Sequence, residues 1–214
     1  MRVVVTRPRG QNRELSERLR AAGHDVVECP LIEIEPLDDG PIDTSSFDWV
    51  VVTSRNGAEL FPLRQTGELR RVAAVGPGTA AALRERGIEP ALVPHVSTQE
   101  GLMKELPDRP GRVLLVAAED ARQLLVHELG ADFVPLYRTR ALRPDPPAGD
   151  LVVLASGSAA RAFAALALDL PAVTIGPHTS AAARAAGVRI AAEAQTHDLD
   201  GLVAAIEHAC SSRS

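Results

Sequence analysis

A stretch of fifteen residues occurs twice in this chain, the second copy one hundred residues after the first. Residues 73–87 read AAVGPGTAAALRERG, and residues 173–187 read VTIGPHTSAAARAAG, with seven of fifteen positions identical. Each copy contains a short apolar run, a Gly-Pro turn and an alanine-rich segment that ends in glycine. This pattern is typical of a strand, a tight turn and a helix that begins with Pro and ends with a glycine cap. The chain is therefore expected to contain two similar α/β halves.

The turn in each copy is suited to bind anions. The first turn of a helix presents unpaired backbone N–H groups and the positive end of the helix dipole. The hydroxyls of Thr79 and Thr179 stand three residues after Gly76 and Gly176, beside these N–H groups. Two such turns predict a ligand with several negative charges, to which both halves bind.

The repetition extends beyond this stretch. FDWVVVTSRNGAELF from Phe47 is echoed by GDLVVLASGSAARAF from Gly149, and TQEGL from Thr98 by DLDGL from Asp198. The first thirty residues match residues 112–136 more weakly. Strands alternate with helices throughout, which predicts an α/β fold of doubly wound parallel sheets with helices on both faces.

Two segments rich in Pro, Asp and Gly, at 36–47 and 143–149, are typical of crossings between domains. A simple duplication would place the boundary near Pro107 instead. The extended segments LIEIEPL and LYRTRAL precede the two crossings at matching places, which favours one domain inserted into the other. The predicted division is residues 1–36 with 143–214 as one domain, 37–142 as the inserted domain, and about 31–37 and 136–142 as two adjacent linker strands.

Composition limits the classes of partner. Apolar residues make up 45% of the 214 residues and aromatic residues only 3%, so stacking on flat rings is not a major binding device. The net charge of −5 argues against nucleic acid, and any anion site has to be built locally from Arg and backbone N–H groups. No apolar run is long enough for a membrane span or a signal peptide.

The two cysteines, Cys29 and Cys210, are isolated in the sequence. Nothing in their spacing indicates a disulfide framework or a metal cluster, and the six histidines show no ligand spacing either. We therefore expect a chain without bound metal in a reducing cytoplasm.

Candidate site residues gather where predicted strands end, because ligands of open parallel sheets bind at the carboxyl ends of strands. The alternative for each turn is that it only caps a helix. The six turns are Thr6–Gly10, Thr53–Gly57, Gly76–Thr79, Ala117–Arg122, Ala155–Ser158 and Gly176–Thr179.

No pair of nucleophile and base stands out. Glu119 and Asp120 are interpreted as a helix N-terminal cap and not as a catalytic carboxylate pair. Tyr137 is the only tyrosine and lies in the second linker segment, where it either serves the site or covers the joint between domains.

The segments VTRPRGQNRELSERLRAAGHDVVECPLIEIEP, VVVTSRNGAELF, LYRTRAL and IGPHTSAAARAAG, in that order, resemble the uroporphyrinogen-III synthase family. The resemblance covers nearly the whole chain. It implies two flavodoxin-like domains joined by a two-stranded linker. It also implies an enzyme that needs no cofactor and cyclises hydroxymethylbilane, a linear tetrapyrrole with eight carboxylates, with inversion of ring D and loss of water.

The resemblance also implies roles for individual residues. Tyr137 matches the family's linker tyrosine and is the candidate to assist departure of the hydroxyl. Arg55 and Gly57 stand where the family more often has Pro and a bulkier residue. Ala155 stands where Thr is usual, which puts hydrogen bonding by the Ala155 turn in doubt. The predicted substrate-binding residues are Arg7, Ser54, Arg55, Gly76, Thr79, Ser156, Gly157, Ser158, Gly176 and Thr179.

The expected partner is a small polycarboxylate, with neither nucleic acid nor membrane, and the expected state is a cytoplasmic monomer. Two other functions are consistent with the same fold. One is a non-catalytic two-lobed binding or sensor domain, which would bind ligand without turnover. The other is a flavodoxin-like redox protein. One Trp and one Tyr are few aromatic residues for binding a flavin ring, which disfavours this function.

Overall fold

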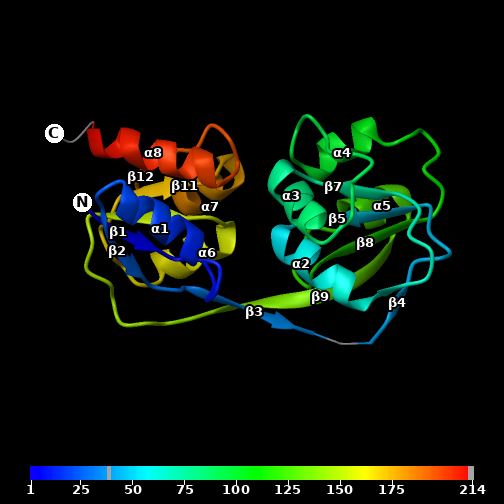
Figure 1. The fold of residues 1–214 in the computed structure, drawn as a ribbon, viewed down its shortest axis with the longest axis horizontal. Helices are drawn as coiled ribbons and strands as arrows, with labels where there is room; N and C mark the ends of the chain where they lie inside the picture. Colours follow the sequence, from blue (N-terminus) through cyan, green and yellow to red (C-terminus); the bar gives the residue numbers. More distant parts are fainter. Residues whose placement is uncertain (38–39, 212–214) are drawn as a thin grey trace. The chain divides into compact units, whose positions relative to one another are not determined.

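The computed structural model describes residues 1–37 and 40–211, which form two compact units (Figure 1). Unit 1 comprises Met1–Glu33 and Thr139–Ser214, and unit 2 comprises Ile34–Arg138. The boundaries expected from the sequence, after residues 36 and 142, lie three and four residues beyond these. Whether each unit folds as an independent domain stays a prediction.

Unit 1 contains a five-stranded parallel sheet. Its strand order is β12-β11-β10-β1-β2, which is the 2-1-3-4-5 order of flavodoxin-like folds when the strands are numbered within the unit. The strands are β1 (Arg2–Val5), β2 (Asp25–Glu28), β10 (Leu151–Leu154), β11 (Ala172–Thr174) and β12 (Ile190–Glu193).

Helices cover both faces of this sheet. Successive side chains of a strand point to opposite faces, so Val3 and Val5 pack with α1 (Arg13–Ala21) and α8 (Leu199–Ser211). Val4, between them, packs with the opposite layer, α6 (Gly157–Ala164) and α7 (Pro177–Ala185). The two layers give unit 1 two separate hydrophobic clusters.

Unit 2 is built in the same way. Its sheet has the order β3-β9-β8-β5-β7, and the last four strands are mutually parallel. The strands are β3 (Ile32–Pro36), β5 (Trp49–Val52), β7 (Val72–Ala74), β8 (Val113–Ala118) and β9 (Asp132–Ala141). One face carries α2 (Arg55–Arg64) and α3 (Pro77–Glu85), and the other α4 (Gln99–Glu105) and α5 (Leu124–Leu129). The neighbouring strands β3 and β9 cross the boundary between the units and form the two-stranded linker.

Unit 2 is a circular permutation of unit 1. Beside β7, residue Leu92 forms a single parallel bridge with Ala73, where a full strand near 91–93 was expected. Counting this bridge, the order β9-β8-β5-β7-Leu92 repeats the order β2-β1-β10-β11-β12. After β3 and β4, the first strand of this repeated order in unit 2 is β5, which corresponds to β10 and not to β1. The α/β class of two doubly wound parallel sheets is thus confirmed.

One small element was not expected. The strands β4 (Ile42–Asp43) and β6 (Gln65–Thr66) pair in parallel. Of these, β4 lies in the segment interpreted as a crossing loop, of which residues 38 and 39 lie outside the described part of the chain. Thr44 fixes this pair, because its hydroxyl donates to the carbonyls of Thr66 and Glu68 at 3.0 and 2.8 Å. Among the described residues, no helix has both the length and the apolar character that crossing a membrane requires.

Candidate functional site

The predicted turns lie at the carboxyl ends of the strands in both units. In unit 1 they follow β1, β10 and β11, and in unit 2 they follow β5, β7 and β8. The two central neighbours of each sheet, β1 and β10 in unit 1 and β8 and β5 in unit 2, flank the point where the strand order reverses. Ligands of such sheets bind at this point. Each unit therefore has a candidate site formed by three turns at one edge of its sheet.

The repeated Gly-Pro turns begin α3 and α7. Gly76 and Gly176 are the N-cap residues, and the threonine three residues later is buried in both copies, with 7% of Thr79 and 5% of Thr179 exposed. Each glycine leaves room for a second loop. A Cβ on Gly176 would lie 2.7 Å from Cδ2 of His197, and a Cβ on Gly76 would lie 3.1 Å from Oγ of Ser97.

These second loops are also repeated at an offset of one hundred residues. Thr98 Oγ1 accepts a hydrogen bond from the Gly101 N–H at 2.9 Å, and Asp198 Oδ1 accepts one from the Gly201 N–H at 2.8 Å. The caps at 98 and 198 fix the residues before them, Ser97 and His197, against the Gly-Pro turns. Sequence reasoning did not select Ser97 or His197, although their offset was a usable signal.

Ser54 and Ser156 cap the helices α2 and α6. Ser54 Oγ accepts from the Gly57 N–H at 3.0 Å, and Ser156 Oγ accepts from the Ala159 N–H at 3.1 Å. Both serines therefore cap helices, and their role in substrate binding stays a prediction.

The remaining predicted residues of the Ala155 turn also have structural contacts. A Cβ on Gly157 would lie 3.2 Å from the Cβ of Ala182, so glycine lets α6 and α7 approach closely. The Ser158 hydroxyl accepts a hydrogen bond from Arg161 at 3.3 Å.

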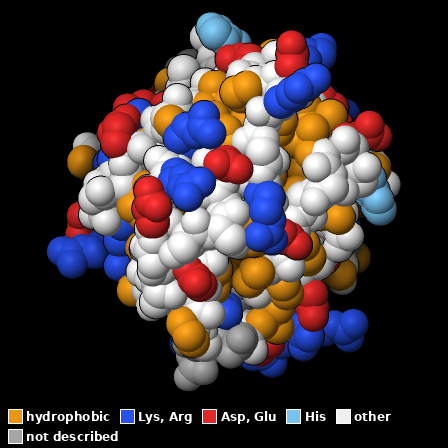
Figure 2. Space-filling model, turned by 90° about the vertical axis from the view of Figure 1, so that its right-hand side faces the viewer, with side chains coloured by type: hydrophobic (Ala, Val, Ile, Leu, Met, Phe, Trp, Pro, Cys, Tyr) orange, Lys and Arg blue, Asp and Glu red, His pale blue; other side chains and the backbone are white. Residues whose placement is uncertain are grey.

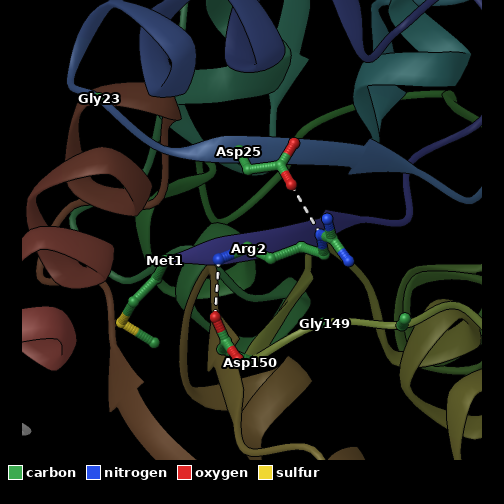
Figure 3. A pocket seen from close by; sticks show the side chains of 7 residues that line it. Met1, Arg2, Gly23, Asp25, Gly149 and Asp150 are labelled. Carbon is green, nitrogen blue, oxygen red and sulfur yellow. Dashed lines mark hydrogen bonds and ion pairs between the residues drawn. The ribbon is translucent and has the colours of Figure 1, made fainter.

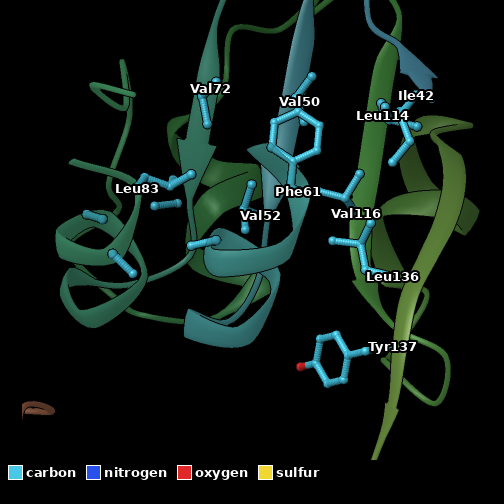
Figure 4. Close-up of a cluster of buried hydrophobic side chains, with 14 residues drawn as sticks. Ile42, Val50, Val52, Phe61, Val72, Leu83, Leu114, Val116, Leu136 and Tyr137 are labelled. Atoms are coloured by element: carbon cyan, nitrogen blue, oxygen red, sulfur yellow. The ribbon is translucent and has the colours of Figure 1, made fainter. Parts of the chain in front are cut away.

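Tyr137 lies on β9 with 4% of its surface exposed (Figure 4). Figure 4 shows its ring at one end of the buried cluster, with the oxygen pointing away from the strand. The hydroxyl is 2.9 Å from Ser54 Oγ and is also hydrogen-bonded by the Asn56 side chain. Burial raises the pKa of Tyr137 above its usual 10, and the hydrogen bonds from Ser54 and Asn56 oppose this rise. The phenol is therefore protonated at neutral pH and can act as a proton donor. Asn56 was not selected from the sequence.

The arginines near these turns are engaged in local contacts. Arg55 forms ion pairs with Glu59 at 3.0 Å and Glu85 at 3.3 Å, which ties the start of α2 to the end of α3. Arg7 follows β1 and is partly buried, and its carbonyl accepts a hydrogen bond from the Asn12 side chain at 3.1 Å. Acidic and basic side chains alternate on the face drawn in Figure 2. Binding of an anion by Arg55 thus has to compete with two carboxylates.

The interpretation of Glu119 and Asp120 as a helix cap is wrong. The next helix, α5, begins only at Leu124, and Glu119 instead forms a bidentate pair with Arg138 of β9 at 2.7 and 3.0 Å. Glu119 therefore joins the turn after β8 to the neighbouring strand.

A pocket in unit 1 lies away from the predicted turns (Figure 3). It surrounds the amino ends of the strands, where Arg2 Nε pairs with Asp25 at 2.7 Å and the Arg2 N–H donates to Asp150 at 2.8 Å. Its charged groups satisfy one another, and it lies at the opposite end of the sheet from the candidate site. Across residues 1–37 and 40–211, no three His, Cys, Asp or Glu side chains gather as a metal site would need.

A family model for uroporphyrinogen-III synthase HemD matches residues 13–204, which span both units. The chain belongs to the uroporphyrinogen-III synthase family. Porphyrin biosynthesis protein HemD of Ruminiclostridium josui is 30% identical over 92% of this chain, which spans about half (46%) of that relative. Uroporphyrinogen-III synthase of Synechococcus elongatus is 27% identical over 96% of this chain and 94% of its own length.

Solved structures of the uroporphyrinogen-III synthase family share the fold. The protein from Helicobacter pylori 26695 aligns with a TM-score of 0.64 at 20% identity, covering 99% of this chain and all (100%) of its own. A mutant from the extremely thermophilic bacterium Thermus thermophilus aligns with a TM-score of 0.60 at 18% identity, with 99% of each chain covered. The chain is thus an enzyme-family member with the family's α/β architecture.

Proposed function

We propose that this chain converts hydroxymethylbilane to uroporphyrinogen III, with inversion of ring D and loss of water. The family match over residues 13–204 carries this proposal, because it includes the candidate turns of both units from Ser54 to Thr179. The repeated anion-binding turns support it, since the substrate carries eight carboxylates.

Binding is proposed to use the turns of both units. Backbone N–H groups at the starts of α3 and α7 bind carboxylates, together with the hydroxyls of Thr79 and Thr179. Arg7, Arg55, Gly76, Gly176 and the turn Ser156-Gly157-Ser158 contribute further contacts. Because the chain has a net charge of −5, attraction to the substrate is local and not due to the overall charge.

The chemistry is proposed to begin at Tyr137. Its phenol gives a proton to the hydroxymethyl group on ring A, at the end of the bilane opposite ring D; the C–O bond breaks, and water leaves with the bonding electron pair. The pyrrole nitrogen lone pair stabilises the resulting azafulvene cation, so the step needs no cofactor. The substituted carbon of ring D then attacks this cation to form a spiro intermediate, which fragments and recloses with ring D reversed.

Most of the catalytic task is then positioning. The free cation closes directly to the unflipped type I isomer, so the protein has to hold the bilane in the folded arrangement that favours attack by the substituted carbon. Orienting the reacting groups in this way contributes far more to the reaction rate than a single proton transfer does. We further propose that the enzyme works as a cytoplasmic monomer on this small molecule, with no nucleic acid or membrane involved.

The deciding experiment supplies freshly generated hydroxymethylbilane to the purified protein, oxidises the products and separates the isomers by chromatography. We expect the type III isomer to dominate. Type I product alone, together with saturable binding of a bilane analogue, would instead show a non-catalytic binding domain.

A further inference from the structure

Two polar side chains from one short segment converge on the buried Tyr137 hydroxyl. Ser54 Oγ lies 2.9 Å from the phenol oxygen, and the Asn56 side chain is its second hydrogen-bonding partner. Ser54 is the N-cap residue of α2, and Asn56 is the second residue of the helix. All three residues belong to unit 2.

The existing cap contact indicates the direction of these hydrogen bonds. Ser54 Oγ already accepts the Gly57 N–H at 3.0 Å, so its own proton is available for donation, and the Tyr137 oxygen lies within reach. The amide of Asn56 provides two further N–H donors. With the phenol oxygen accepting from Ser54 and Asn56, its own proton points elsewhere.

We propose that Ser54 and Asn56 are positioning residues that donate to the Tyr137 oxygen, so that the phenolic proton is free for the substrate and the phenolate left behind is stabilised. This inference rests on the proposed function of Tyr137 as proton donor. The proton leaves Tyr137 to form water with the departing hydroxyl. The ring carbon loses a proton when the macrocycle closes, and that proton restores the phenol.

Unit 1 has the cap without the phenol. Val5 pairs with Glu28 as Leu115 pairs with Phe133 in the corresponding strands. Four residues further along the chain stand Ile32, at the start of β3, and Tyr137, within β9. Ile32 is part of a hydrophobic cluster of unit 1. The positions that correspond to Ser54 and Asn56 are Ser156 and Ser158 in the repeat. Side chains that donate hydrogen bonds to a phenol are therefore found only in unit 2. The corresponding positions of unit 1, Ser156 and Ser158, serve as matched controls.

The electrostatic surroundings of Tyr137 agree with this assignment. Burial is the largest influence and raises its pKa, while Ser54 and Asn56 lower it, as donors to a phenolate do. Asp120, in the turn after β8, is the charged group that acts on the phenol, and it raises the pKa.

The test uses the fact that the chain has one tyrosine. Alkaline titration of the near-ultraviolet phenolate absorbance therefore reports the pKa of Tyr137 alone. Ser54→Ala and Asn56→Asp are compared with wild type, and Ser156→Ala and Ser158→Ala serve as controls. Asn56→Asp keeps the size of the side chain but replaces two N–H donors with a charged acceptor.

We expect both unit 2 variants to raise the Tyr137 pKa, by about half a unit to one unit for Ser54→Ala and by more for Asn56→Asp. The controls should leave the titration curve unchanged. An unchanged or lowered pKa in either unit 2 variant overturns the proposal, because a phenol that donates to Ser54 would be more acidic without it. Circular dichroism across the pH range identifies any variant that unfolds at alkaline pH. For such a variant, the carbon-13 chemical shift of labelled tyrosine, measured by NMR at neutral pH, replaces the titration.

Turnover provides the second readout. We expect Asn56→Asp to lower kcat by about tenfold with little change in KM. This is a fraction of a complete general-acid effect, which is about 100- to 10,000-fold. A raised KM at unchanged kcat would make Asn56 a binding residue and overturn the positioning role. Because the titration needs no substrate, its result is independent of whether the proposed activity is found.

Discussion

At the level of single residues, Tyr137 combines burial with the phenolic proton that the proposed mechanism uses. Its 4% exposure keeps bulk water from the phenol, and burial raises its pKa. Both effects preserve a neutral donor at physiological pH. The corresponding residue of unit 1, Ile32, has no group that can give a proton, so the proposed acid belongs to one unit only.

We predict that Tyr137→Phe still forms the type III isomer, at a rate lowered by roughly tenfold to 100-fold. The reduction is small for a general acid because the bilane loses water spontaneously and the pyrrole nitrogen stabilises the cation. More type I isomer should appear, formed from unbound bilane. The measurement is the coupled assay with separation of isomers. Wild-type rates in a folded Tyr137→Phe protein would leave Tyr137 as a residue that only covers the joint.

At the level of elements, the two Gly-Pro turns differ in how closely the second loop approaches. The Cβ of an alanine at 176 would meet the His197 ring at 2.7 to 3.2 Å, whereas one at 76 would meet Ser97 at 3.1 to 3.2 Å. Both glycines have extended backbones, so close approach and not a left-handed conformation accounts for glycine here.

We therefore predict that Gly176→Ala destabilises the protein by about 1–3 kcal/mol through overpacking. Gly76→Ala should be closer to neutral, because alanine reduces the entropy of the unfolded chain by about 0.4–1 kcal/mol. Urea unfolding measures both. The double variant Gly176→Ala with His197→Ala should lose less free energy of unfolding than the sum of the two single variants. A loss equal to that sum would exclude the His197 ring as the cause.

A third prediction concerns pH and the start of α4. The bidentate pair with Arg122 is the main reason that the pKa of Glu100 falls to about 2, against about 4.3 for an unfolded chain. A lowered pKa stabilises the fold above the unfolded value, and this stabilisation disappears as pH falls from about 4.3 toward 2. Glu100→Gln should lower the Tm at pH 7 but not at pH 2. Glu128→Gln, on neighbouring α5, is the control, and an equal loss at both pH values would contradict the mechanism.

Most of the helices and strands could be predicted from the sequence because they carry a local signal, whereas the short pair β4 and β6 was not expected. The strands are β-branched runs, and Gly87 and Gly187 have the left-handed φ of +78° and +80° expected of glycines that end helices. Contacts between distant segments could not be predicted. The pairing of Asn56 with Tyr137 depends on the register of β9 beside β8, and that of Glu119 with Arg138 likewise. The roles of the site residues themselves stay predictions.

At the level of the whole molecule, each hydrophobic cluster lies within one unit. Two belong to unit 1 and two to unit 2. The only tryptophan, Trp49, is 5% exposed in a cluster of unit 2. Its fluorescence therefore reports the unfolding of unit 2, while far-ultraviolet circular dichroism reports both units.

We predict that the two signals do not superimpose during urea unfolding, because cores that share no residues are free to melt in separate steps. Circular dichroism should show a transition that tryptophan fluorescence lacks. Coincident curves at several temperatures would mean that the two units unfold as one cooperative body.

The insertion of unit 2 also decides what a single proteolytic cut would do. Residues 143–149 form an irregular and largely exposed crossing, the kind of segment that proteases cleave first. A cut there severs β1 and β2 from β10, β11 and β12 in the chain, yet β1 and β10 are hydrogen-bonded neighbours at the centre of one sheet. The nicked protein should therefore run as two fragments on a denaturing gel and as one species on a sizing column. The hydrogen-bonded pair of β1 and β10 thus holds the two fragments of the cut chain together.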